Sequence, residues 1–179
     1  TKAMMGQGMV FTDTSLYELG GYLLLRQEFF RKLILTAGLR LHYQEIAGNE
    51  WVPQLGLNYL INTNNVIKLT ASKGFRNPTI RELFMWQPAN PDLRPERMWN
   101  YEAGYIGSIP AARISLEGAV YFQQGSNLIQ TIGQFPAVRY ENTGEFTHYG
   151  LELAGTWEAL SFLTVEANYS WLHMEDPIT

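Results

Sequence analysis

Residues 33–43 read LILTAGLRLHY, and their side chains alternate between two kinds. Every odd position is apolar or aromatic, whereas the even positions include Arg40 and His42. A period of two places successive side chains on opposite faces of a β-strand. Residues 51–61, WVPQLGLNYLI, repeat the alternation. The sequence therefore predicts strands that have one polar face and one face with almost no charge.

The same alternation continues along the chain and predicts eight strands. The one charged residue on their apolar face is Lys73, at a strand end, where its side chain is expected to reach toward water. Short and long connections alternate, with the long ones at 45–50, 75–97 and 125–147. The first strand is thus expected to run away from the long loops and the last strand toward them. The predicted strands cover residues 17–29, 32–44, 51–62, 66–74, 98–107, 113–124, 148–157 and 162–173.

The apolar face is expected to contact lipid. Charged residues make up 17% of the chain, below the roughly 25% of an average soluble protein. A Lys or Arg facing lipid at the membrane midplane costs about 2–4 kcal/mol, and Trp and Tyr gather at the two membrane interfaces. The fold predicted is all-β: an antiparallel up-and-down transmembrane β-barrel, of which this chain is a fragment of about eight strands. The aromatic residues expected near one rim are Trp51, Trp99 and Trp171, and those near the other are Tyr59, Tyr105 and Trp157.

Several classes of function find no support in the sequence. The chain has no cysteine, which excludes disulfides and thiolate metal sites, and its three histidines lack the spacing of metal ligands. Neither a Gly-x-Ser-x-Gly motif nor a phosphate-binding glycine loop occurs. The net charge of −4 argues against nucleic-acid binding. We therefore expect no enzymatic activity, no metal, no cofactor and no nucleic-acid partner.

The segment GFRNPTIRELFMWQPANPDLRPERMWNYEAGY, residues 74–105, is the most informative local stretch. It predicts a short helix over 79–84, with Asn77 as its N-cap and Pro78 just inside the helix. Asn90 and Pro91 then predict a turn that leads back into a strand. A helical turn at the rim of a barrel is consistent with this pattern.

Parts of this segment resemble a known family. The late barrel of TonB-dependent outer-membrane receptors is similar to FRNPTIREL (75–83), NPDLRPE (90–96) and NYEAGY (100–105), and its flanking strands are similar to GLRLHY (38–43), PQLGLNYLI (53–61) and GLELAGTW (150–157). The resemblance implies a large barrel of the 22-stranded class with a plugged lumen in a bacterial outer membrane. It also implies binding of a scarce external nutrient, such as an iron-siderophore complex, cobalamin, haem or a glycan. Energy for import would come from the TonB complex.

Residues 1–179 are interpreted as one partial barrel, without a plug domain or a TonB-contacting box. The expected partners are outer-membrane lipid, an extracellular nutrient and the TonB complex, the last through N-terminal parts that this chain lacks. About eight strands cannot enclose the lumen of the whole family barrel. An isolated fragment is expected to close on itself, pair with another copy through its edge strands, or aggregate.

The candidate ligand contacts lie in or beside the long loops. Arg76 and Arg81, with Glu82, have an alternative role, in which they hold the loop by ion pairing. Two alternative functions also remain open: a passive porin-like channel and a soluble β-barrel that binds a small ligand. In the soluble alternative the apolar face packs inside a small core. The ligand-binding candidates are Arg76, Arg81, Trp86, Phe135, Arg139, Tyr140 and His148.

Overall fold

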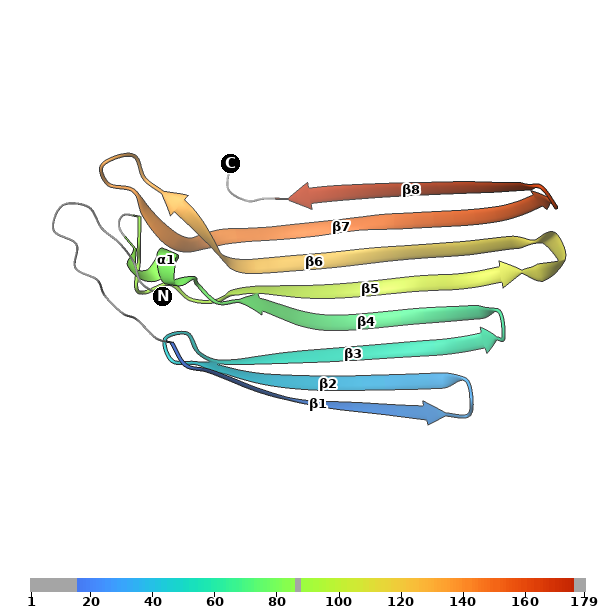
Figure 1. Cartoon of the computed structure of the whole chain (residues 1–179), viewed down its shortest axis with the longest axis horizontal. Coiled ribbons are helices and arrows are strands. Elements are labelled where there is room, and N and C mark those ends of the chain that lie inside the picture. The colour runs from blue at the N-terminus through green and yellow to red at the C-terminus, as the bar shows by residue number, and fades with distance from the viewer. Residues whose placement is uncertain (1–15, 86–87, 176–179) are drawn as a thin grey trace.

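The computed structural model describes residues 16–85 and 88–175, and these form one antiparallel sheet of eight strands. Each strand pairs only with its neighbours in sequence, in the order β1 to β8 (Figure 1). The predicted all-β, up-and-down fold is confirmed. The strands are β1 (Glu18–Phe29), β2 (Leu33–Gln44), β3 (Gly48–Asn62), β4 (Asn65–Arg76), β5 (Glu96–Ile109), β6 (Ile114–Ile132), β7 (Arg139–Leu160) and β8 (Leu163–Glu175).

The pairing register sorts the side chains into two faces. One row of directly paired residues crosses six strands and is apolar at every step: Leu57, Leu69, Ala103, Val120, Leu151 and Trp171. The adjacent row on the other face pairs Lys68 with Gly104 and Glu152 with Ala119. Cross-strand neighbours on one face interact directly, so each row acts as a continuous surface. The alternation in the sequence therefore becomes one apolar and one polar face of the whole sheet.

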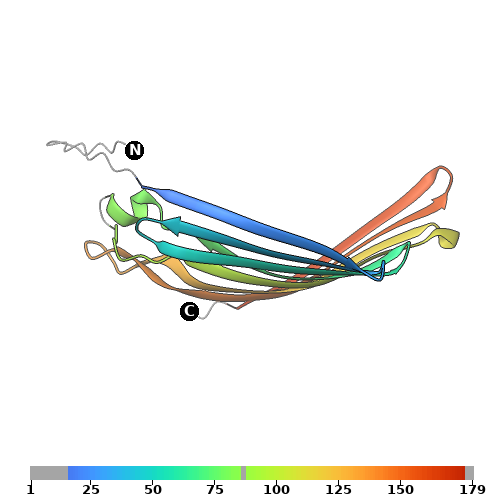
Figure 2. The same cartoon turned by 90° about the horizontal axis from the view of Figure 1, so that it is seen from below.

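The sheet has almost no hydrophobic core of its own. Among the described residues, the buried apolar side chains are Leu83, Leu93 and the prolines Pro78 and Pro95, and all four belong to the connection between β4 and β5. Val120, in the middle of the apolar face, is 56% exposed. The sheet is bowed and twisted, as a section of a barrel wall would be (Figure 2). This arrangement does not fit the soluble alternative, because the apolar face does not pack on itself.

Aromatic rings form a belt on the apolar face at the end of the sheet where the long connections lie. The belt confirms the expected positions of Trp51, Trp99 and Trp171. Tyr59 lies eight residues along β3 from Trp51, or about 27 Å at a rise of ~3.4 Å per residue. With a strand tilt of about 35–45°, this separation approaches the height of the apolar band of a membrane barrel. The ring centroids are 6.5 Å apart for Trp51 and Trp99, 6.3 Å for Tyr101 and Phe122, and 5.9 Å for Tyr149 and Trp171.

Three details of the predicted connections are wrong. The expected loop 125–147 is mostly strand, because β6 and β7 continue as a hairpin and leave 133–138 as the connection. The expected loop 45–50 shortens to the three residues 45–47, because β3 already begins at Gly48. The helix α1 (Ile80–Phe84) has Thr79 as its N-cap in place of Asn77, so Pro78 lies before the helix.

The strands run in the expected directions, with β1 leaving the loop end and β8 returning to it (Figure 1). β1 and β8 are the two edges of the sheet and do not pair with each other in the described part of the chain. The expectation that an isolated fragment associates through these edges stays a prediction.

Candidate functional site

The long connections gather at one end of the sheet and form a mouth. α1 and the tip of the β6–β7 hairpin lie together at this end, and the short turns lie at the other (Figure 1). In barrels of this kind, loops carry binding while the strands supply a rigid frame. No helix among the described residues is long and apolar enough to cross a membrane.

α1 is only five residues long, and its first turn is fixed by a reciprocal capping box. The Thr79 hydroxyl accepts a hydrogen bond from the backbone N–H of Glu82 (3.3 Å), and the Glu82 carboxylate accepts one from the Thr79 N–H (2.7 Å). Leu83, on the buried side of this helix, has no exposed surface. The cap and one buried leucine thus stabilise a helix too short to be stable by itself.

Arg76 lies at the centre of an ion-pair network at the base of α1. Its guanidinium donates to Glu96 (2.6 and 2.9 Å) and to Glu82 (3.1–3.3 Å). Glu96 also accepts a hydrogen bond from the backbone N–H of Ile129 in β6 (2.9 Å). The network therefore joins the end of β4, the helix, the start of β5 and the β6–β7 hairpin.

The carboxylate of Glu82 has a perturbed acidity. Burial alone would raise its pKa, but the Arg76 guanidinium and the hydrogen bonds from Thr79 outweigh burial and hold the pKa of Glu82 below its ordinary value of 4.5. A lowered folded-state pKa means that the charged form stabilises the loop. That stabilisation is complete above pH 4.5 and is lost as the pH falls through the lower folded value.

We expect acidification to loosen α1. A nitroxide attached through Arg81→Cys would report on the helix, because the 179 residues contain no other cysteine and Arg81 is exposed. Its electron paramagnetic resonance line should sharpen as the pH falls below the pKa that the Glu82 carboxylate has in the folded protein. In Glu82→Gln the label should be mobile already at neutral pH and should lose this pH dependence. A line shape that is independent of pH in the unsubstituted loop would contradict the role of Glu82.

Two asparagines join the β4–β5 connection to the β6–β7 hairpin. The Asn142 side chain accepts from the Arg94 N–H (2.7 Å) and donates to the carbonyls of Arg94 (2.9 Å) and Asn127 (2.7 Å). Asn90 donates its side-chain N–H to the Tyr140 carbonyl (2.8 Å). The Tyr140 N–H in turn donates to the Pro88 carbonyl (2.7 Å).

These contacts make one unit of segments far apart in sequence. We call this unit the loop body; it comprises residues 77–85 and 88–95 together with the outer hairpin residues 126–132 and 139–145. Backbone groups that leave a regular ladder need other partners, and here side-chain amides supply them. The mouth therefore has a defined shape on this side.

The predicted ligand contacts do not form one cluster. Arg76 and Tyr140 hold the loop body through the contacts above, and Arg139 pairs with Glu141 on the outer hairpin. Arg81 is exposed on α1, and Phe135, at the hairpin tip, is 92% exposed. His148 lies nine residues along β7 from Arg139, about 30 Å along the strand at ~3.4 Å per residue, and packs on Phe146. Trp86 lies outside the described residues.

Sequence reasoning missed the residues that join the loops. Asn142 gave no local signal, because its partners Arg94 and Asn127 are 48 and 15 residues away. Glu50 was also missed. It is 3% exposed in the folded structure, and its side chain binds Lys73 (2.9 Å) and Arg97. Lys73 therefore does not reach toward water as expected; it is 8% exposed.

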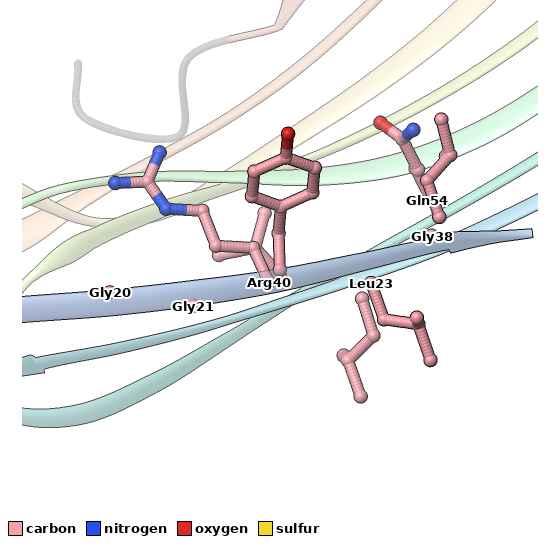
Figure 3. Close-up of a pocket in the computed structure, with 10 residues that line it drawn as sticks. Gly20, Gly21, Leu23, Gly38, Arg40 and Gln54 are labelled. Carbon is pink, nitrogen blue, oxygen red and sulfur yellow. The ribbon is translucent and has the colours of Figure 1, made fainter.

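A hollow of about 600 Å³ lies on the polar face over β1–β3, in the half nearer the loops. Arg40 and Gln54 point to this side of the sheet, and Leu23 points to the other (Figure 3). A Cβ added at Gly38 would come within 2.7 Å of the Gln54 side chain, so the glycine allows that side chain to lie across β2. Within the described ranges no group of His, Cys, Asp or Glu is arranged to hold a metal ion.

The fold, the two-faced sheet and the loop mouth define the class: a section of a transmembrane β-barrel wall. The family model described as TonB dependent receptor-like, beta-barrel, matches residues 5–179. The chain belongs to the TonB-dependent receptor family, whose members are outer-membrane β-barrel proteins of Gram-negative bacteria. Its relatives are receptors and transporters, not enzymes.

One curated relative is the vitamin B12 transporter BtuB of Vibrio vulnificus, 30% identical over 128 residues, which are 70% of this chain and 20% of that protein. The siderophore receptor PirA of Pseudomonas aeruginosa shares the fold with a TM-score of 0.79 at 18% identity, over 89% of this chain and 32% of that one. The FrpB iron transporter of Neisseria meningitidis shares the fold with a TM-score of 0.74 at 15% identity, over 90% of this chain and 26% of that one. The chain thus spans about a third or less of the length of these proteins.

Proposed function

We propose that residues 1–179 form part of the barrel wall of a receptor that binds a scarce nutrient at its outer mouth and imports it with energy from TonB. A plug and a TonB-contacting segment belong, in this proposal, to parts of the receptor outside this chain. The observation that carries the proposal is the loop body: a shaped, hydrogen-bonded mouth at one end of a family barrel wall. A passive pore needs no such arrangement of Asn90, Asn142 and Arg76 at its rim.

Two chemical classes of nutrient are candidates, a corrinoid and a ferric siderophore. The curated relative at 30% identity is a vitamin B12 transporter, whereas the solved siderophore receptors are 15–18% identical and support the fold alone. A corrinoid is therefore the first compound to test, and a ferric siderophore is the second. In both cases the exposed residues of the mouth, such as Arg81 and Phe135, are the proposed contacts.

The test is uptake by the complete receptor in a strain that lacks its own cobalamin and enterobactin receptors. We expect labelled cyanocobalamin or ferric enterobactin to accumulate only when TonB is present. Replacement of residues 80–84 by a Gly-Ser linker of equal length should abolish accumulation while the barrel still assembles. Accumulation that does not depend on TonB and rises linearly with concentration would instead establish the porin-like alternative.

A further inference from the structure

The ladder between β3 and β4 stops before the loop end of the sheet. Its last pair is Gln54 with Ser72, yet β3 begins at Gly48 and β4 continues to Arg76. β3 remains paired with β2 in this region, and β4 remains paired with β5. We call the unpaired stretch, residues 48–53 and 73–76, the seam. The seam separates the wall β1–β3 from the strands that carry the loop body.

A buried carboxylate bridges the seam. Oε2 of Glu50 binds Nζ of Lys73 at 2.9 Å, and Oε1 accepts a hydrogen bond from Nε of Arg97 at 2.8 Å. Glu50 is 3% exposed and Lys73 is 8% exposed. By the register, Glu50 pairs with His42 on the polar face, whereas Lys73 pairs with Trp99 on the apolar face. These two side chains meet because backbone pairing no longer separates the faces there.

Among the described residues, the other contacts across the seam include no further ion pair. The His42 and Phe75 ring centroids lie 5.0 Å apart, and those of Trp51 and Trp99 lie 6.5 Å apart. Asn77, which precedes α1, lies 3.2 Å from Nε2 of His42, with donor and acceptor set by the histidine tautomer. Nζ of Lys73 also lies 5.0 Å from the centroid of the Trp51 ring. In contrast, the loop body is joined to β5–β7 by the Arg76 network and by the hydrogen bonds of Asn90 and Asn142. The seam is therefore the less supported side of the mouth.

We propose that Glu50 is a positioning residue that fastens β4 and β5, the strands that carry the loop body, to the wall β1–β3 and so sets the width of the mouth. This inference deepens the proposed function, since the mouth is taken to admit the nutrient. Loss of one partner from a buried ion pair leaves an uncompensated charge, which is costly in a site with little water. Removal of the carboxylate should therefore free the strands on the two sides of the seam to move apart.

The direct test measures the seam in the complete receptor without any nutrient. Nitroxide labels introduced by Tyr22→Cys on β1 and Arg81→Cys on α1 report the distance between the wall and the loop body. We expect Glu50→Gln to broaden the distance distribution and to speed amide exchange over residues 73–79 by about tenfold or more. Amide exchange at the short turn of residues 161–162 should be unchanged. Glu117→Gln, at an exposed carboxylate on the polar face, is the matched control and should alter neither measurement.

Further variants separate positioning from a general loss of stability. Glu50→Gln with Lys73→Met removes the stranded cation, and the distance distribution should remain broad because the bridge is still absent. If Glu50→Gln does not assemble, Arg97→Gln keeps the bond to Lys73 and should broaden the distribution less. An unchanged distribution in the variant that assembles would overturn the proposal. Because no nutrient is present, this result stands whether or not cyanocobalamin or ferric enterobactin is transported.

Discussion

Val120→Arg is expected to prevent most of the receptor from reaching a folded state in the membrane. Val120 pairs with Ala103 and Leu151 in the middle of the apolar row and is 56% exposed. An arginine that faces lipid at the midplane costs about 2–4 kcal/mol. That loss is a large fraction of the stability of a typical folded protein.

The neighbouring residue supplies the matched control. Ala119 pairs with Gly104 and Glu152 on the polar face, where it lines a second hollow, over β4–β7, together with Glu102, Glu117 and Glu152. An arginine at 119 meets carboxylates instead of lipid, so its cost should be much smaller.

The measurement is the fraction of barrel that migrates as the folded form in an unheated gel, together with urea unfolding in lipid vesicles. Val120→Leu should behave as the unsubstituted receptor, because it keeps an apolar side chain. Equal losses for Val120→Arg and Ala119→Arg would show that the two faces of the sheet do not differ in environment, and the membrane assignment of the apolar face would fail.

Asn142→Ala is expected to release the β4–β5 connection from the β6–β7 hairpin. The substitution removes three hydrogen bonds of 2.7–2.9 Å to the backbone of Arg94 and Asn127. At about 0.5–1.5 kcal/mol each, the three bonds together make the local stability of the loop body fall by about 1.5–4.5 kcal/mol. The strands within the membrane should be unaffected, since Asn142 lies in the outer part of the hairpin.

Amide exchange over residues 88–95 measures this effect and should be faster by about one to three orders of magnitude, as about 1.4 kcal/mol corresponds to tenfold. Thr131→Ala is the control, because Thr131 is an exposed residue of the same hairpin. Nutrient uptake should fall in Asn142→Ala and not in Thr131→Ala. Unchanged exchange in Asn142→Ala would show that the two connections are ordered independently.

The strands could be predicted because alternation is a local property of the chain. The ends of β6 and β7 nearest the loops could not be predicted, because the regular pairing of the two strands is interrupted there. In β6 the register shifts between Gly125, Leu128 and Ile129, and Asn127 has a positive φ of 58°. Bulges change which face the next side chain occupies, so the period of two is lost although pairing continues. Residues 125–147 were therefore predicted to be a loop.

The N-cap of α1 was predicted wrongly, although the sequence contains the motif that marks it. Thr79 and Glu82 have the spacing of a capping box, Thr-x-x-Glu, which could have been read directly. The prediction instead followed Asn77 and Pro78, because proline favours the first helical position. The contacts within the candidate site, in contrast, could not be predicted from local sequence. Arg76, Glu82 and Glu96 meet through tertiary structure, and no local pattern pairs Asn142 with Arg94.

The connectivity of the sheet has a consequence for assembly. Since every strand pairs only with the one before and the one after it, each hairpin can form as soon as its two strands are available. Such local pairing involves short loop closures and avoids a slow search for distant partners. A folding machine could therefore add this wall to a growing barrel two strands at a time, with each newly exposed edge serving as the template for the next hairpin.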